Sequence, residues 1–282
     1  MDLKNALKNE SPTVECNKNG MNLSVIQNDC VVGMDALQEK TASAIVTSPP
    51  YNIGIKYNKH QDNLPNDAYL SWLRKVFLSC ERVLRDDGHF FLQMGGTSVD
   101  PLIPWRVLSA AQDAGFTLQN EIVWVKSVTV GEQSFGQFKP INSKRYLNHT
   151  HEYIFHLTKR GDVPVDRLSV GVPFVYASNI KRFKVLRTES DKRCRGNVWF
   201  IPYETVQSNR DRGEHPATFP VALPEMCIRL AGIPKKSLVI DPFAGTGTTL
   251  IACQKLGMSG LGFEISEKYC KFANRRLRES SV

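Results

Sequence analysis

A short segment, residues 48–51, combines residue types that could bind the exocyclic amine of a nucleobase. Such an amine is a weak nucleophile because its lone pair is delocalised into the ring. An enzyme must therefore accept hydrogen bonds from its N–H groups and align it with an electrophile. The Ser48 hydroxyl and the Pro49 carbonyl can accept these bonds, while the rings of Pro49 and Pro50 fix the backbone and carry no competing N–H. Tyr51 can stack on a base turned out of the duplex.

A glycine-rich turn far downstream could bind a small cofactor. An apolar run at residues 238–240 ends in Asp241, and Gly245 and Gly247 allow the backbone to turn sharply and approach a ligand. Thr248 begins a predicted helix whose N–H groups face the turn. A phosphate-binding loop would carry lysine there, which argues against nucleotide-triphosphate hydrolysis. Glu264 ends the next predicted strand, about 20 residues on, where an acid binds ribose hydroxyls in comparable folds. The alternative for Glu264 is a surface acid.

The two motifs, in this order, resemble those of the β class of DNA amino-methyltransferases, in which the catalytic segment precedes the cofactor turn. Serine at position 48 resembles the N4-cytosine branch of that family. The resemblance implies S-adenosylmethionine as cofactor, double-stranded DNA as partner, and methyl transfer to the N4 amine of a flipped-out cytosine. It implies that the catalytic residues are Ser48, Pro49, Pro50 and Tyr51. It further implies cofactor contacts by Asp29, Cys30, His215, Pro216, Phe219, Asp241, Phe243, Ala244, Gly245, Gly247, Thr248 and Glu264.

Other functions remain open at this point. A hydroxyl at Ser48 can accept from the cytosine amine and donate to ring atom N3 at once, but adenine N6 has a similar neighbour, N1. An N6-adenine methyltransferase of the same class is therefore the first alternative. A nucleic-acid-binding protein without catalysis is the second, and an enzyme that acts on protein or RNA is the third. The resemblance also suggests a restriction endonuclease as a partner in the host.

The charge distribution favours a polyanionic partner. The chain has 282 residues, a formal net charge of +8 and a pI of about 9.1. Residues 159–212 hold 12 Lys and Arg against 6 Asp and Glu, so most of the surplus lies in one irregular segment. That segment is either a solvated insertion or a lobe that contacts phosphates and base edges. The candidate DNA-binding residues in it are Lys181, Arg182, Lys184, Arg187, Lys192, Arg193 and Arg195.

Strands alternating with helices predict an α/β fold: a Rossmann-like, doubly wound, mostly parallel sheet. The resemblance implies a class I methyltransferase with circularly permuted motif order and an inserted, basic target-recognition lobe. Strands are expected at 23–26, 44–46, 89–94, 117–126, 153–157, 238–240 and 260–263, and helices at 66–84, 105–113, 248–256 and 266–277. We divide the chain into a flexible arm (1–22), a catalytic half (23–158), a target-recognition insertion (159–212) and a cofactor-binding half (213–282).

The sequence gives no sign of a metal site or a membrane span. The seven cysteines lack metal-ligand spacing, and an odd number of them argues for free thiols. His149, His151 and His156 alternate along a predicted strand without paired acids, which favours structural roles. No run of about 18 apolar residues occurs, and the polar start does not resemble a secretory signal. We therefore expect an intracellular, DNA-associated protein, in the cytoplasm of a bacterium or the nucleus of a eukaryotic host.

Overall fold

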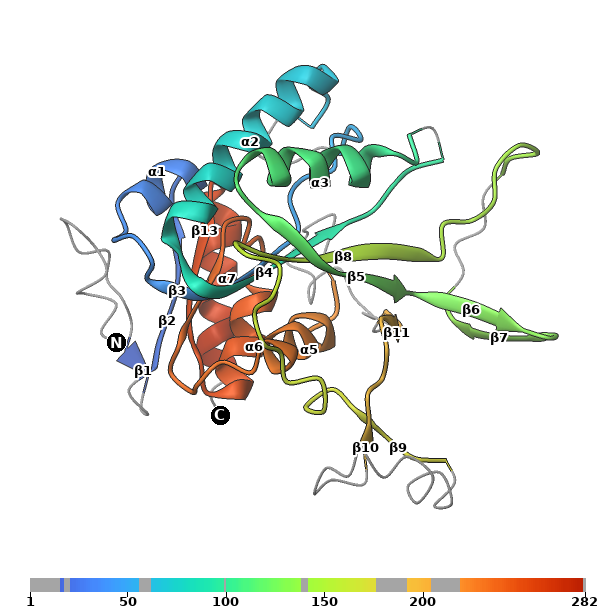
Figure 1. Ribbon diagram of the computed structural model, residues 1–282. Helices are drawn as coiled ribbons and strands as arrows, with labels where there is room; N and C mark the ends of the chain where they lie inside the picture. Colours follow the sequence, from blue (N-terminus) through green and yellow to red (C-terminus); the bar gives the residue numbers. More distant parts are fainter. Residues whose placement is uncertain are drawn as a thin grey trace.

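The computed structural model describes residues 16–17, 21–55, 62–98, 100–137, 142–175, 192–203 and 219–280. Within these residues a nine-stranded sheet carries helices on both faces (Figure 1). This architecture confirms the predicted α/β fold with a mostly parallel sheet.

Seven of the nine strands run in one direction. In spatial order the sheet consists of β1 (Cys16–Asn17), β2 (Met21–Gln27), β13 (Ser259–Glu264), β12 (Leu238–Asp241), β3 (Ala42–Thr47), β4 (Leu84–Met94), β8 (His151–Thr158), β5 (Thr117–Val125) and β11 (Val198–Phe200). Only β1 and β8 are antiparallel to their neighbours. The carboxyl ends of the other strands therefore share one edge of the sheet, and β8 begins at that edge.

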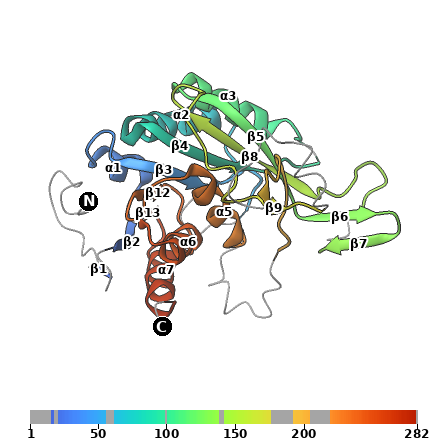
Figure 2. The same ribbon diagram turned by 60° about the horizontal axis from the view of Figure 1, so that its bottom comes forward.

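Two groups of helices bury the two faces of the sheet (Figures 1 and 2). One face carries α1 (Cys30–Asp35), α2 (Asn66–Val83) and α3 (Ile103–Asp113), and the other carries α5 (Ala222–Ala231), α6 (Thr248–Leu256) and α7 (Glu267–Glu279). Side chains alternate between the faces along each strand, so Ile45 of β3 joins the first core and its neighbours Ala44 and Val46 join the second.

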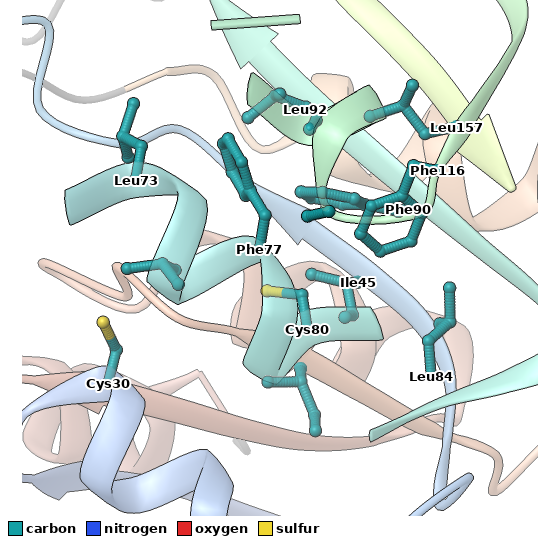
Figure 3. Packing of buried hydrophobic residues seen from close by; sticks show 14 of the residues in the cluster. Cys30, Ile45, Leu73, Phe77, Cys80, Leu84, Phe90, Leu92, Phe116 and Leu157 are labelled. Carbon is teal, nitrogen blue, oxygen red and sulfur yellow. The ribbon is translucent and has the colours of Figure 1, made fainter. Parts of the chain in front are cut away.

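The α2 helix shows how the sequence pattern produces this packing. Leu73, Phe77 and Cys80 recur at helical spacing and are fully buried, and Figure 3 shows them facing Ile45 and Phe90 of the sheet. The expected helix at 66–84 is thus confirmed. It ends because residue 84 turns directly into the extended backbone of β4.

The structure differs from the sequence-based expectation in three places, each of which involves strands. The β4 strand begins at Leu84 rather than at residue 89, with a register irregularity opposite Ala42 and Ala44. An antiparallel hairpin, β6 (Ser127–Val130) and β7 (Gln133–Gly136), follows β5 and extends away from the sheet (Figure 2). A second two-stranded ribbon joins β9 (Val172–Pro173) to β10 (Lys192–Arg193).

The proposed division of the chain stays a prediction, with two structural observations to add. β1, inside the expected arm, pairs with β2, which itself begins at Met21. β11, inside the expected insertion, pairs in parallel with β5 and so belongs to the main sheet.

No helix in the described part of the chain is both long and apolar enough to span a membrane. The same residues contain no group of three or more histidine, cysteine or acidic side chains that could hold a metal ion.

A pair of histidines is buried between β4 and β8. His89 Nδ1 lies 3.0 Å from His156 Nε2, and the Asn120 amide lies 2.9 Å from His156 Nδ1. Burial lowers the pKa of His89 to about 4 and, together with the neighbouring His89, lowers that of His156 to about 3. Both imidazoles are therefore neutral at pH 7 and have a structural role, as the sequence suggested for His156.

This pair is expected to make the fold sensitive to acid. The unfolded histidines take up protons near pH 6.5, whereas folded His89 and His156 take them up only near pH 4 and pH 3. Stability is therefore lost as pH falls from 6.5 toward these values. The loss is on the order of 2 kcal/mol for each histidine by pH 5. Asp241 works in the opposite direction, because burial raises its pKa to about 6. Chemical denaturation of the wild type and of a His89→Leu, His156→Leu variant between pH 7 and 4.5 isolates the histidine contribution. The free energy of unfolding should depend less steeply on pH in the double variant than in the wild type. The exposed control His151→Gln should show the same pH dependence as the wild type. Equal pH dependence in the double variant and the wild type would contradict the expectation.

Candidate functional site

The predicted motifs meet at the carboxyl edge of the sheet. β3 leads into Ser48, β12 ends in Asp241 and β13 ends in Glu264, and these three strands are neighbours in the order β13, β12, β3. β2, on the other side of β13, leads into Asp29. This edge is where open α/β sheets bind their ligands.

The glycine turn packs tightly against the next strand. Gly247 has a φ of 79°, a left-handed conformation that suits glycine, and it forms the N-terminal cap of α6. The Ala244 N–H donates to the Phe263 carbonyl at 3.0 Å. A Cβ at Gly262 would lie 2.6 Å from the Ala244 Cβ, so this approach requires glycine. The turn is thus fixed against β13.

Asp241 connects the glycine turn to the candidate catalytic segment, residues 48–51. Its side chain is buried, with 1% of the residue exposed, and its Oδ1 accepts from the Thr47 hydroxyl at 2.6 Å and from the Phe243 N–H at 3.0 Å. Burial raises the pKa of this carboxyl to about 6, and hydrogen bonds from Thr47, Thr249 and Phe243 oppose the shift. The end of β3 and the start of the glycine turn are therefore held together by one carboxylate.

Two further acids lie at adjacent strand ends. The Glu264 carboxylate accepts from the Gly245 N–H at 3.1 Å and from the Ser266 N–H at 2.7 Å, and burial raises its pKa. The exposed Asp29 caps α1 by accepting from the Val31 and Val32 N–H groups at 2.9 and 3.1 Å. A carboxylate oxygen has lone pairs left after one such bond, so both acids can accept from a ligand.

These residues fit the implied cofactor. S-adenosylmethionine offers ribose hydroxyls and an adenine amine as donors. Glu264 is an acceptor at the end of β13, and Asp29 is an acceptor just after the neighbouring strand β2. Phe243 is partly buried, with its ring centroid 5.6 Å from that of Trp72, and adds an apolar surface beside the turn.

Hydrogen bonds hold the backbone at and just after the candidate catalytic segment. Pro49 is buried, whereas Ser48, Pro50 and Tyr51 are partly exposed. The Tyr69 hydroxyl donates to the Pro50 carbonyl at 2.6 Å. Asp62, which is 3% exposed, accepts from the N–H groups of residues 52, 53 and 55. Asp62 was not predicted, because a single acid eleven residues beyond Tyr51 has no local signature.

A polar cluster beside Tyr51 was also missed. The Tyr51 Oη lies 3.3 Å from Ser48 Oγ, 2.8 Å from Gln93 Oε1 and 3.1 Å from Glu152 Oε2. The Lys126 ammonium donates to Glu152 Oε1 at 2.7 Å. We refer to Gln93, Lys126 and Glu152 as the support cluster.

The remaining predicted site residues are placed as follows. Cys30 is 6% exposed, packs in the core (Figure 3) and has its thiol pKa raised to about 12 by burial. Phe219 is partly buried against the second core. Lys192 and Arg193 are exposed on β10, whereas Arg195 donates to the Val170 carbonyl at 2.9 Å. Lys181, Arg182, Lys184, Arg187, His215 and Pro216 lie outside the described residues.

Comparison with protein families identifies the class of protein. Residues 42–275 match the N6_N4_Mtase family, described as DNA methylase. The chain belongs to this family. The match covers the candidate catalytic segment, the glycine turn and Glu264, and membership confirms S-adenosylmethionine as the cofactor of this DNA methylase.

Two curated relatives extend the comparison. The methylase is 26% identical over 257 residues to the Type II methyltransferase M.HpaI of Haemophilus parainfluenzae, covering 91% of this chain and 74% of the relative. It is 27% identical over 266 residues to the DNA adenine methyltransferase YhdJ of Escherichia coli K12, covering 92% and 83%.

Solved structures confirm the methyltransferase fold. The cytosine-N4-specific PvuII DNA methyltransferase superimposes with a TM-score of 0.67 at 20% identity, covering 92% of this chain and 90% of that one. A putative DNA modification methylase from Thermus thermophilus, complexed with S-adenosyl-L-methionine, gives a TM-score of 0.62 at 23% identity, covering 92% and 94%.

Proposed function

We propose that this DNA methylase transfers the methyl group of S-adenosylmethionine to the N4 amine of a cytosine flipped out of double-stranded DNA. The observation that carries the proposal is the 2.6 Å hydrogen bond from the Thr47 hydroxyl to Asp241. It holds the candidate catalytic segment and the cofactor turn side by side. A base amine at Ser48 and a methyl donor at the turn would then be neighbours, which is the main requirement of an in-line transfer.

The chain supplies hydrogen-bond acceptors and a stacking surface for this reaction. The bound cofactor supplies an electrophilic methyl group on a sulfonium. The Ser48 hydroxyl and the Pro49 carbonyl accept from the two N–H groups of the amine, which returns lone-pair density to nitrogen. The Tyr51 ring stacks on the flipped base. The amine becomes acidic once it carries the methyl group, so it loses a proton without a strong base.

The choice of cytosine rests on the neutral acceptor at position 48 and on the resemblance to the N4 branch. A hydroxyl does not repel the lone pair of cytosine N3 as an ionised carboxylate would. Adenine N1 has a similar lone pair, and a relative is described as an adenine methyltransferase, so N6-adenine methylation is the second candidate. A DNA-binding protein without catalysis is a third, although Ser48, Tyr51 and Asp241 are all present.

The deciding experiment treats duplex DNA with the protein and methyl-labelled S-adenosylmethionine and identifies labelled nucleosides by mass spectrometry. Label in N4-methylcytosine supports the proposal. Label only in N6-methyladenine promotes the second candidate. No label in either nucleoside, with the cofactor still bound, would favour the third.

Ser48→Ala is expected to lower kcat by about 10- to 100-fold, because one acceptor of the amine is lost in the transition state. Cofactor affinity measured by calorimetry should not change, since the Asp241 carboxylate keeps its hydrogen bond from Thr47. Ser71→Ala, at an exposed position on α2, is the matched control, and its kcat and cofactor affinity should equal those of the wild type. A normal kcat for Ser48→Ala would remove Ser48 from the catalytic segment.

The partners and the location follow from the same proposal. The basic segment 159–212 is the proposed recognition lobe, and Lys192 and Arg193 are exposed for contact with phosphates. A restriction endonuclease in the host is a proposed partner, because M.HpaI is a Type II methyltransferase. We place the protein on DNA in a bacterial cytoplasm.

A further inference from the structure

We propose that the support cluster orients the Tyr51 hydroxyl and, through it, the Ser48 hydroxyl, so that Ser48 presents only lone pairs to the target amine. Gln93, Lys126 and Glu152 are positioning residues in this proposal, which rests on the proposed function because it concerns the same site. Their effect is transmitted through hydrogen bonds and not through contact with the base.

The sheet topology brings the cluster together. Gln93 lies near the end of β4, and Lys126 follows the end of β5. The intervening strand β8 is antiparallel to both, so its second residue, Glu152, lies at the same edge. The support cluster therefore lies beside the catalytic segment, with Glu152 between the other two.

The hydrogen bonds have a definite direction. Glu152 accepts from Lys126 on Oε1, and from the Gln93 amide and Tyr51 on Oε2. A phenol has one hydrogen, and in this arrangement it points toward Glu152 Oε2 and Gln93 Oε1. Ser48 is then the donor in its 3.3 Å contact with the Tyr51 Oη. The Ser48 hydrogen is thereby used, and its remaining lone pairs are free to accept.

Burial argues that the cluster has a role beyond stability. The side chains of Lys126 and Glu152 are only 16% and 13% exposed, and Gln93 is 2% exposed. An ion pair this far from water adds little stability, because removing two charges from water offsets their attraction. The Lys126–Glu152 ion pair does keep Glu152 charged and holds its carboxylate in one orientation. A chain of such bonds also polarises its members, which makes the Ser48 oxygen a better acceptor.

Gly95 allows this close arrangement. A Cβ at that position would lie 2.8 Å from the Glu152 Cδ and 2.9 Å from the Tyr51 Cε2. Any larger residue must therefore push Tyr51 and Glu152 out of place.

The orientation has a consequence for base choice. Ser48 cannot donate to the ring nitrogen of the base while its hydrogen points to Tyr51. The neutral Ser48 oxygen still avoids the repulsion that a carboxylate would exert on cytosine N3, but a hydrogen bond from Ser48 to the ring nitrogen does not contribute to the choice of base.

The first test uses the protein alone. A 3-fluorotyrosine placed at position 51 reports the environment of the ring by fluorine NMR. Glu152→Gln is expected to shift this signal, whereas Glu132→Gln, an exposed position in the β6–β7 turn, should leave it in place. An unshifted signal in Glu152→Gln would overturn the proposal. This measurement needs neither cofactor nor DNA, so it is independent of the proposed function.

The second test is a double-mutant cycle on methyl transfer. Glu152→Gln should lower kcat about tenfold with an unchanged KM for the cofactor, as expected when one positioning bond is lost. In a Tyr51→Phe background the same change should have an effect of less than about twofold, because the mediating hydroxyl is already gone. Equal effects in both backgrounds would show that Glu152 does not act through Tyr51.

Gly95→Ala keeps the test decisive if Glu152→Gln does not fold, because it retains every polar group. Its kcat should fall about tenfold while cofactor affinity is kept. A wild-type kcat in Gly95→Ala would overturn the proposal. If the wild type labels no cytosine although the fluorine signal shifts as expected, the proposed function fails and the positioning of Tyr51 stands.

Discussion

Asp241→Ala is expected to reduce the affinity for S-adenosylmethionine at least about 100-fold, to a level that calorimetry no longer detects. The substitution leaves the Thr47 hydroxyl and the Phe243 N–H without their shared acceptor in a buried site. Each such group costs about 1–3 kcal/mol, and both hold the glycine turn in its binding conformation. The same change should lower the thermal unfolding midpoint.

Asp162→Ala serves as the control for Asp241→Ala, because Asp162 is exposed and forms a surface ion pair with Arg160. It should bind the cofactor as the wild type does. Asp241→Asn keeps the shape of the side chain, and its affinity for the cofactor should lie between those of Asp241→Ala and Asp162→Ala. Unchanged affinity in Asp241→Ala would contradict the role assigned to this carboxylate.

Tyr51→Ala should lower kcat by about 100-fold. Loss of base stacking accounts for about 1–3 kcal/mol of this effect, and loss of the hydroxyl removes the acceptor of the Ser48 hydrogen. Single-turnover methyl transfer with saturating DNA and cofactor measures the chemical step directly. Cofactor binding should be retained.

Tyr51→Phe separates the two contributions, because it keeps the ring and removes only the hydroxyl. We expect about a tenfold lower kcat for this variant. Equal rates for Tyr51→Ala and Tyr51→Phe would mean that stacking contributes nothing, and a wild-type rate for Tyr51→Ala would exclude Tyr51 from the site.

The sequence predicted that the candidate catalytic segment and the glycine turn lie at the same edge of the sheet, because both follow apolar runs typical of parallel strands. Parallel neighbours end at one edge, so Ser48 and Asp241 had to lie close once the fold class was assigned. The contact from Thr47 to Asp241 was not predicted, since nothing in a β-branched residue at a strand end indicates its partner 194 residues away.

The support cluster could not be predicted from local patterns. Its three residues lie on different strands, and Glu152 reaches the site only because β8 runs against its neighbours. An apolar run such as 153–157 indicates a strand but not its direction. The early start of β4 at Leu84 was not predicted, because the sequence Asp86-Asp87-Gly88 is typical of a turn.

The β6–β7 hairpin, by contrast, could have been predicted from its local sequence pattern. Val128 and Val130 alternate with polar residues, and Gly131-Glu132 forms a two-residue connection of the kind that joins hairpin strands.

The place of β12 and β13 in the sheet also determines when the molecule can become complete during synthesis. These strands, residues 238–264, lie between β2 and β3, which leave the ribosome much earlier. Until the late strands arrive, the edges of β2 and β3 that face them have unpaired N–H and C=O groups. The nascent chain therefore carries the candidate catalytic segment, while residues 52–240 are synthesised, without the Asp241 carboxylate that anchors it through Thr47. In the proposed function, methyl transfer becomes possible only once residues 238–264 have filled the gap in the sheet.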